Sequence, residues 1–384
     1  MITTVQTNIS STDTLTAAIN PLRIIMAAGG TGGHVYPAIA IADSLRKKMG
    51  DAEILFVGTR DRMEWETVPK YGYEIKSVWI SGFHRRFTMK NLLFPFKVLV
   101  SLIQSLMILR SFRPDLVISC GGFASGPIGW VASKLSVPLF IQEQNSYPGV
   151  TNRLLSKYAA GIFTAFDEAS NYLPAEKIVL TGNPIRSGIE SSDIESSRQK
   201  FGFSSTRKTI LILGGSGGAK AINEIMFKEH EKLHNSGNLQ IIWQCGKHYF
   251  ESLNRSIDLQ KYPNLRLMPF IEEMPAAYDV ADLVITRAGA GTCSELMNLG
   301  QPALLIPSPN VAGNHQYKNA RSMADANAAD LLDESDLQDH FTDRILELIN
   351  DPQRLDKMSN AMRKLAKPQA ADHIANEILS RIKE

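Results

Sequence analysis

The chain repeats one opening pattern of hydrophobic and small residues. Residues 22–28 form an apolar run of strand length, which leads into the glycine-rich segment 29–33 and then into helically spaced apolar positions at 36–49. About half a chain length later, the apolar run 209–213 leads into a second glycine-rich segment, 214–218, and another helical pattern. Each half is therefore predicted to form a domain that begins with a strand, a glycine loop and a helix.

Both halves continue as alternating strand and helix patterns. The further strand candidates are 54–58, 75–80, 115–120, 138–142, 162–165 and 178–181 in the first half, and 239–245, 265–269, 283–286, 303–307 and 329–331 in the second. Three helical patterns close the chain, at 336–350, 352–365 and 370–382. Such alternation is typical of parallel sheets covered by helices on both faces. We therefore predict an α/β protein with two Rossmann-like, doubly wound domains, 21–186 and 208–367, that face a cleft.

The segments outside the two predicted domains are polar. Residues 187–207 are rich in Ser and charged side chains and are expected to be a linker. Residues 1–20 contain eight Ser or Thr and no Lys or Arg. They lack the basic start and apolar centre of a signal peptide, so we expect a disordered extension.

Charge and cysteine content exclude several classes of function. Lys and Arg number 41 against 39 Asp and Glu, and this balance argues against a nucleic-acid partner. The three cysteines are far apart and form no CxxC pair, so neither a disulfide framework nor a cysteine-based zinc site is expected. No Asp-x-Asp pair is available for the divalent ion that often accompanies a nucleotide sugar. We therefore expect no metal and no cofactor.

The two glycine loops favour a bound phosphate over an empty turn. A loop of this kind in front of a helix offers backbone N–H groups and the positive end of the helix dipole to an anion. The dinucleotide fingerprint fails because Val35 takes the place of its third glycine, and neither loop has the lysine of a P-loop. His34 follows the first loop, where the dipole disfavours a protonated ring. It is a candidate general base, or a histidine that caps or packs locally.

Other polar and glycine-rich segments follow predicted strands. Gly121 and Gly122 allow close approach of a ligand, and the polar cluster 142–145 suits hydrogen bonds to a sugar or peptide. Arg186, at the domain junction, is a candidate phosphate ligand or one half of an interdomain salt bridge. In the second half, Glu295 could accept two ribose hydroxyls or complement a helix dipole. Gln316 could bind a sugar or cap a helix start.

These motifs, and their order along the chain, resemble the MurG family of bacterial cell-wall glycosyltransferases. The segments that carry the resemblance read GGTGGHVYP at 29–37, GGFASGP at 121–127, EQN at 143–145, GNPIR at 182–186, GGSGGA at 214–219, RAGAGTCSE at 287–295 and NHQ at 314–316. Together they cover nearly the whole chain. The family's second loop usually has Gln where this chain has Gly217, so affinity for the donor is expected to differ.

The resemblance implies a GT-B fold and an inverting, metal-independent single displacement. In it, N-acetylglucosamine passes from UDP-GlcNAc to undecaprenyl-diphosphate-linked muramyl pentapeptide (lipid I) and gives lipid II, with His34 as the candidate base. Implied donor contacts are Thr31, Gly32, Gly33, Asn145, Arg186, Ser216, Ile271, Ala290, Gly291, Thr292, Cys293, Ser294, Glu295 and Gln316. Implied contacts to the acceptor diphosphate are Gly29, Gly30, Gly121, Gly122 and Glu143. The last helix, about 368–384, is expected to pack on the first domain.

An apolar stretch in the first half suggests contact with a membrane. Residues 92–109 are long enough to span one, but Lys97 and Gln104 are costly in lipid. An amphipathic helix with a wide apolar side is therefore predicted. A substrate that stays in the membrane requires docking at its cytoplasmic face, and segment 83–96 mixes basic and aromatic residues as an interfacial patch does. The alternative is a loop and helix that pack on their own domain.

Three other functions remain open at this point. A UDP-GlcNAc 2-epimerase would share the fold and the nucleotide sugar but would need no lipid acceptor. A relative acting on diacylglycerol or a small natural product would keep the donor half and change the first domain. A non-catalytic nucleotide-binding module is the third. The basic and apolar stretch near residue 85 and the complete glycine motifs favour the cell-wall transferase.

Overall fold

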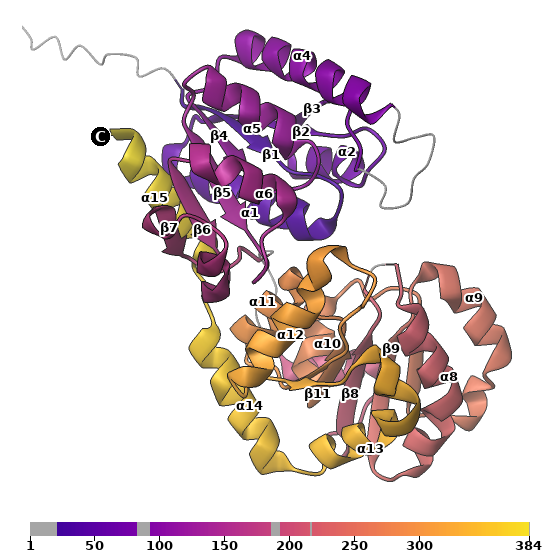
Figure 1. Ribbon diagram of the computed structural model, residues 1–384. Helices are drawn as coiled ribbons and strands as arrows, with labels where there is room; N and C mark the ends of the chain where they lie inside the picture. The colour runs from indigo at the N-terminus through magenta and orange to yellow at the C-terminus, as the bar shows by residue number, and fades with distance from the viewer. Residues whose placement is uncertain (1–20, 83–92, 186–192, 216, 384) are drawn as a thin grey trace, which may run out of the picture.

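Each half of the chain forms one parallel sheet covered by helices on both faces (Figure 1). The computed structural model describes residues 21–82, 93–185, 193–215 and 217–383. The first sheet has seven strands: β1 (Arg23–Ala27), β2 (Glu53–Gly58), β3 (Glu74–Ser77), β4 (Leu116–Ser119), β5 (Leu139–Glu143), β6 (Gly161–Thr164) and β7 (Ile178–Leu180). The second has six: β8 (Lys208–Leu213), β9 (Leu239–Gln244), β10 (Leu265–Met268), β11 (Leu283–Thr286), β12 (Ala303–Leu305) and β13 (Asp330–Leu331).

Helices connect the strands as the sequence pattern predicts. Those of the first half are α1 (Gly32–Met49), α2 (Glu64–Thr67), α4 (Phe94–Phe112), α5 (Ser125–Lys134) and α6 (Val150–Leu155). The remaining helices are α7 (Ile194–Phe201), α8 (Lys220–Asn235), α9 (Lys247–Ser256), α10 (Met274–Val280), α11 (Ala290–Leu299), α12 (His315–Asp325), α13 (Leu337–Ile349), α14 (Pro352–Leu365) and α15 (Ala370–Lys383). Helix α1 begins at Gly32, earlier than expected, so His34 lies in its first turn.

The inner strands are buried because both faces of each sheet are covered, whereas the edge strands β3, β7 and β13 are only partly buried or exposed. Along β1, Ile24 and Met26 face a core that includes α1 and α15, whereas Ile25 and Ala27 face a second core with α5. Successive strand residues point to opposite faces, so an apolar residue at every position requires two such layers. This arrangement confirms the predicted doubly wound α/β architecture.

The strand order places four loops where ligands bind in folds of this class. The first sheet runs β3-β2-β1-β4-β5-β6-β7, and the second runs β10-β9-β8-β11-β12-β13. The order reverses between β1 and β4 in the first sheet and between β8 and β11 in the second. In open parallel sheets the binding crevice lies beyond the carboxyl ends of the strands at this reversal. The loops at these four strand ends carry the glycine-rich motifs of the sequence.

Two segments between and after the sheets pack as follows. Helix α15 returns to the first domain, where Ser44 Oγ on α1 donates to Asp372 Oδ1 at 2.5 Å and Ile374 and Ile378 enter the core (Figure 1). The segment expected to be a linker contains α7, which packs on α10 of the second domain, and Ser197 Oγ there donates to Asp279 Oδ2 at 3.1 Å. Residues 1–20 and 187–192 lie outside the described residues.

Candidate functional site

The two glycine loops of the first domain pack directly on each other. Gly122 has a φ of +89°, and a Cβ there would lie 2.2 Å from the backbone oxygen of Gly29. Gly121 has a φ of +96°, and a Cβ there would lie 2.6 Å from Cδ2 of His34. Ser125 Oγ donates to the backbone oxygens of Ala27 and Gly121, both at 2.8 Å. Glycine is favoured at both positions because φ is positive and because the His34 ring, at 121, or the backbone of the first loop, at 122, occupies the space of a side chain.

His34 is held between these loops in a form suited to accept a proton. It is half-buried in the first turn of α1, with Nδ1 3.1 Å from Thr31 Oγ1. Burial lowers the pKa of His34 below 6.5, and His315 of the second domain lowers the pKa further. The Glu143 and Glu64 carboxylates and a hydrogen bond to the Gly29 backbone oppose this effect. The ring is therefore neutral at pH 7, as a general base requires.

Glu143 organises the polar loop that follows β5. Its Oε1 accepts from the backbone N–H and side-chain Nδ2 of Asn145, at 3.0 and 3.1 Å. Its Oε2 accepts from the backbone N–H of Gly149 and from Asn152 Nδ2, at 3.0 and 2.9 Å. The side chain is buried, with 1% of its surface exposed. These four hydrogen bonds make Glu143 a group that positions Asn145.

The two domains meet at this same loop. Asn319 on α12 is buried, and its Oδ1 accepts from the backbone N–H and the Oγ of Ser146, at 3.0 and 2.9 Å. Its Nδ2 lies 3.4 Å from Asn145 Oδ1. Lys318 Nζ lies 3.4 Å from the ring centroid of Tyr147. Helix α1 also contacts α11, so the motifs of the two halves are brought together.

The second glycine loop, 214–218, also contains a glycine with positive φ in close contact with the backbone of a neighbouring loop. Gly218 has a φ of +79°, and a Cβ there would lie 2.2 Å from the backbone oxygen of Cys245. Gln244 Nε2 donates to the backbone oxygen of Gly215 at 2.9 Å. A Cβ on Gly217 would have no described heavy atom within 4 Å, so a longer side chain, as in the family's usual Gln, has room to begin there without a clash. Ser216 lies outside the described residues.

The first turn of α11 lies at the carboxyl end of β11, and Glu295 lies further along the same helix. Gly289 precedes the helix in an extended conformation. Cys293 and Ser294 are buried, and burial raises the pKa of the Cys293 thiol to about 12. The Cys293 N–H donates to the Gly289 backbone oxygen at 2.9 Å, and Ser294 Oγ donates to the Ala290 oxygen at 2.9 Å, so both residues are bonded within the helix. Glu295 Oε2 accepts from the hydroxyl of Tyr278 at 3.1 Å, which fixes one carboxylate oxygen.

The remaining predicted donor contacts differ in their surroundings. Ile271 is 2% exposed and packs in the core, so its backbone is the part available to a ligand. Gln316 Oε1 accepts from the backbone N–H of Ser308 at 2.8 Å, as a residue that caps the preceding loop does. Thr31 is exposed in front of α1. Arg186 lies outside the described residues.

Two residues at the site carry no local sequence signal. Glu64 is buried beneath the first glycine loop, although it lies in a polar segment of charged residues. Asn319 is buried by a domain that begins far away in the chain. Glu64 bonds to Thr59, five residues earlier, and to Gly30 in another loop, whereas Asn319 bonds to Ser146, 173 residues away; neither periodicity nor motif spacing could reveal these contacts. Among the described residues, no group of three or more His, Cys, Asp or Glu is placed to hold a metal ion.

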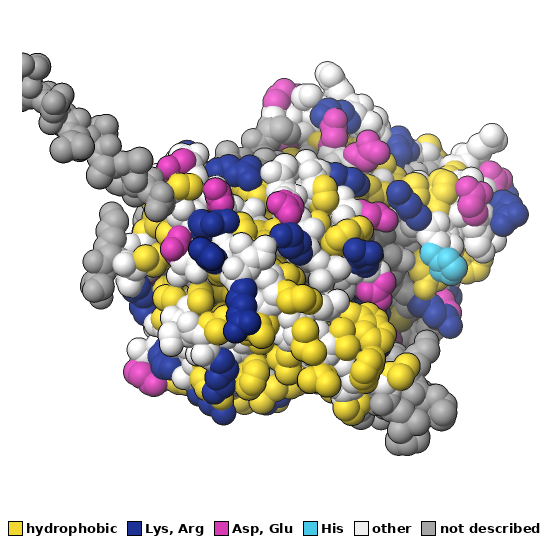
Figure 2. Space-filling view, turned by 90° about the horizontal axis from the view of Figure 1, so that it is seen from above, with side chains coloured by type: hydrophobic (Ala, Val, Ile, Leu, Met, Phe, Trp, Pro, Cys, Tyr) yellow, Lys and Arg dark blue, Asp and Glu magenta, His cyan; other side chains and the backbone are white. Residues whose placement is uncertain are grey.

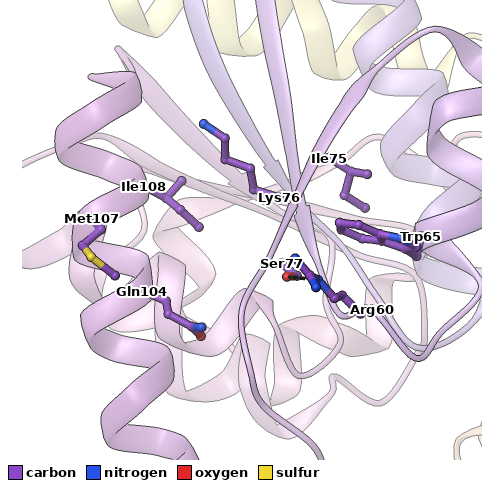
Figure 3. Close-up of a pocket in the computed structure, with 8 residues that line it drawn as sticks. All are labelled: Arg60, Trp65, Ile75, Lys76, Ser77, Gln104, Met107 and Ile108. Carbon is purple, nitrogen blue, oxygen red and sulfur yellow. Dashed lines mark hydrogen bonds between the residues drawn. The ribbon is translucent and has the colours of Figure 1, made fainter.

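A cavity of about 330 Å³ lies away from the glycine loops, beside α4. Figure 3 shows Gln104, Met107 and Ile108 on the α4 side and Trp65 and Arg60 on the other. The Arg60 guanidinium lies 5.4 Å from the Trp65 ring centroid, and its Nε donates to Ser77 Oγ at 3.2 Å. This cavity combines a cation with apolar side chains at the edge of the first domain.

Comparison with known proteins identifies the family. The N-terminal domain of glycosyltransferase family 28 matches residues 24–164, and the family's C-terminal domain matches residues 209–374. A relative from Christiangramia forsetii, named UDP-N-acetylglucosamine–N-acetylmuramyl-(pentapeptide) pyrophosphoryl-undecaprenol N-acetylglucosamine transferase, is 46% identical over 93% of this chain and 97% of its own.

Solved structures agree in fold over nearly the whole chain. MurG from Acinetobacter baumannii is 31% identical, with a TM-score of 0.74 over 94% of this chain and 100% of its own. A UDP-GlcNAc 2-epimerase from Neisseria meningitidis has a TM-score of 0.65 over 94% of this chain and 100% of its own, but it is 15% identical, which shows the fold alone. The GT-B-like fold is thus confirmed, and the chain belongs to the MurG branch of glycosyltransferase family 28.

Proposed function

We propose that this protein transfers N-acetylglucosamine from UDP-GlcNAc to lipid I and so forms lipid II for peptidoglycan. The observation that carries the proposal is the likeness, over 93% of the chain, to a relative whose name states this reaction. The geometry agrees with it, because glycine loops from both domains and His34 lie at the strand reversals of the two sheets. The likeness to the 2-epimerase shows the fold alone.

The arrangement suits a single displacement with inversion. The acceptor hydroxyl attacks the anomeric carbon, the bond to the UDP oxygen breaks, and the proton of the hydroxyl passes to neutral His34. The leaving diphosphate gains charge, which the first turn of α11 and the second glycine loop stabilise through backbone N–H groups. The Glu295 carboxylate, which accepts a hydrogen bond from Tyr278, accepts those of a ribose in the proposed scheme. In this scheme the donor lies on the second domain and the acceptor diphosphate on the first.

Release of UDP tests this function directly. We expect release from UDP-GlcNAc only when a short-chain lipid I analogue is present, and at an unchanged rate in excess EDTA. Donor binding without acceptor-dependent release would favour the epimerase or a relative with another acceptor. Activity that disappears only in EDTA would contradict a metal-independent displacement.

We further propose that the first domain docks peripherally on the cytoplasmic face of the inner membrane through α4. This helix is long and apolar enough to cross a membrane by length and composition. It instead packs along α5, and its buried side includes Ser101 and Ser105. Its outward side carries Phe96, Leu99, Ile103 and Met107, each more than half exposed. An apolar face turned to solvent is typical of an interfacial helix.

Other side chains around α4 also support docking of this face on a membrane. The hydrophobic side chains form a broad area on this face, with Lys and Arg beside it (Figure 2). Trp79 and Trp130 are exposed, and Lys97 and Lys134 lie 5.5 and 5.6 Å from their ring centroids. Basic side chains next to aromatic ones match the headgroup layer of an anionic membrane. Most of the segment 83–96, proposed from the sequence as the patch, lies outside the described residues; its last four residues are Leu93 and the first three residues of α4.

The double substitution Leu99→Gln and Ile103→Gln tests the docking face. We expect it to reduce sedimentation with anionic phospholipid vesicles at least about tenfold, because two exposed apolar side chains no longer enter the lipid. Turnover of a short-chain, water-soluble lipid I analogue should be unchanged. Phe227→Gln, which removes an exposed apolar side chain from α8 of the second domain, is the control. Vesicle binding equal to that of the unmodified protein would exclude α4 as the docking surface.

A further inference from the structure

A buried carboxylate lies beneath the first glycine loop. Glu64, the first residue of α2, is 0% exposed. Its Oε2 accepts from the backbone N–H of Gly30 at 3.0 Å. Its Oε1 accepts from the backbone N–H and the hydroxyl of Thr59, at 3.0 and 2.8 Å. One side chain thus joins the loop after β1 to the loop after β2.

The side chain of Glu64 occupies the space that side chains at positions 29 and 58 would need. A Cβ on Gly29 would lie 2.7 Å from Glu64 Oε1, and a Cβ on Gly58 would lie 2.6 Å from Glu64 Cγ. The ends of β1 and β2 are therefore shaped around this carboxylate. A side chain at position 29 would displace the Glu64 carboxylate, so glycine there serves a contact inside the protein.

Removal of this carboxylate from water has an energetic cost, which an apolar side chain of similar size at the same place would not have. An ionised carboxylate removed from water must be compensated by hydrogen bonds or by a cation. Among the described residues Glu64 forms no salt bridge with Lys, Arg or His, so its three hydrogen bonds supply the compensation. Hydrogen bonds to a charged acceptor are stronger and more directional than neutral ones. They hold the Gly30 peptide in one orientation.

That orientation matters because of the residues that follow Gly30. Its N–H donates to the Glu64 carboxylate, and the contact of Gly30 with the acceptor diphosphate stays a prediction. Thr31, which contacts His34 Nδ1, is the next residue, and the His34 N–H donates to the Thr31 oxygen at 3.1 Å. The Glu64 carboxylate also raises the pKa of His34 through its charge. Glu64 thus bears on both the place and the charge of the candidate base.

We propose that Glu64 is a positioning residue for the transfer reaction, which fixes the Gly29–Gly30 turn and through it His34. The proposal rests on the proposed function, because it concerns the same reacting centre. Glu64 contacts neither substrate; it acts through the loop. A displacement of about 1 Å at a reacting group can lower a rate about a hundredfold. Loss of Glu64 is therefore expected to lower kcat.

Glu64→Gln is the variant that tests this role. It retains size and one acceptor oxygen, but its amide N–H₂ must face a donor N–H of Gly30 or Thr59. We expect kcat for a soluble lipid I analogue to fall about 10- to 100-fold, with KM for UDP-GlcNAc within about threefold of the unmodified value. The acid limb of the kcat profile should move to lower pH, because the negative charge that favours protonated His34 is gone.

Asp115→Asn provides the matched control. The Asp115 carboxylate accepts from the backbone N–H of Arg23 at 2.7 Å, at the opposite end of the same strand β1. We expect this variant to keep the rate and the pH profile. If Glu64→Gln fails to fold, Thr59→Val, which removes one of the three hydrogen bonds, should lower kcat in the same direction by a smaller factor.

The outcomes separate the two proposals. A Glu64→Gln protein with unchanged kcat and pH profile would overturn the positioning role while leaving the transfer reaction in place. An equal loss of rate in Glu64→Gln and Asp115→Asn, each with a lowered Tm, would show a role in stability alone. Absence of lipid I turnover in the unmodified protein would instead refute the proposed function, whatever Glu64 does.

Discussion

His34→Ala is expected to lower kcat for transfer to a lipid I analogue about 10²- to 10⁴-fold, the range that a positioned general base contributes. Binding of UDP-GlcNAc, measured by calorimetry, should stay within about threefold, because loops of the second domain hold the nucleotide in the proposed scheme. His34→Gln, which refills most of the space against Gly121, should be nearly as slow. If the protein were a non-catalytic nucleotide-binding module, the unmodified protein would already show no turnover.

A comparison with Thr31→Val separates proton transfer from loop structure. This variant removes the hydroxyl that lies 3.1 Å from His34 Nδ1 and leaves the ring in place. We expect a loss of rate well below that of His34→Ala. If His34→Ala retains more than about a tenth of kcat, another group or a water molecule takes the proton.

The pH dependence follows from the direction in which the pKa of His34 is shifted. Burial lowers this pKa below 6.5, so the ring stays neutral to a lower pH than a solvent-exposed histidine does. The neutral ring is the base, and kcat should therefore be constant at alkaline pH and decline only as the pH falls through a pKa that lies below 6.5. A decline that begins above pH 7 in the unmodified protein would contradict a buried, neutral His34.

The fold could be predicted in detail because its signals are local. Each strand of the two sheets lies within a few residues of an apolar run that the sequence shows, since a strand buried on both faces has an apolar residue at almost every position. The apolar pattern places the start of α1 too late. Glycines at 32 and 33 are poor helix formers, but the extended Thr31 in front of them starts the helix there.

The site could be predicted only in part. Motif positions such as Gly121, Gly122 and His34 are brought together as expected, because all lie at the carboxyl ends of neighbouring strands. The direction of single groups could not be read, as with the Gly30 N–H that turns inward. Asn319 could not be found for a related reason: its partner Ser146 is 173 residues away, and no local pattern encodes such a pair.

The contact between the two glycine loops of the first domain leads to a further large effect. Gly122→Ala is expected to lower the free energy of unfolding by about 3 to 5 kcal/mol, since strain at positive φ and an overpacked contact each cost about 1 to 3 kcal/mol. The new Cβ would lie 2.2 Å from the Gly29 backbone oxygen, and backbone cannot rotate away as a side chain can. The first loop must move, so transfer activity should fall with stability.

Gly30→Ala is the matched comparison for this substitution. Gly30 has a φ of +92°, close to that of Gly122, but among the described residues beyond its own chain neighbours no heavy atom lies within 4 Å of its Cβ position. Only the conformational cost remains, about 1 to 2 kcal/mol. The Tm of Gly122→Ala in thermal unfolding should therefore be several degrees lower than that of Gly30→Ala. Equal Tm values would mean that the two loops are not in contact in solution, and that their packing cannot be what places His34 at the reacting centre.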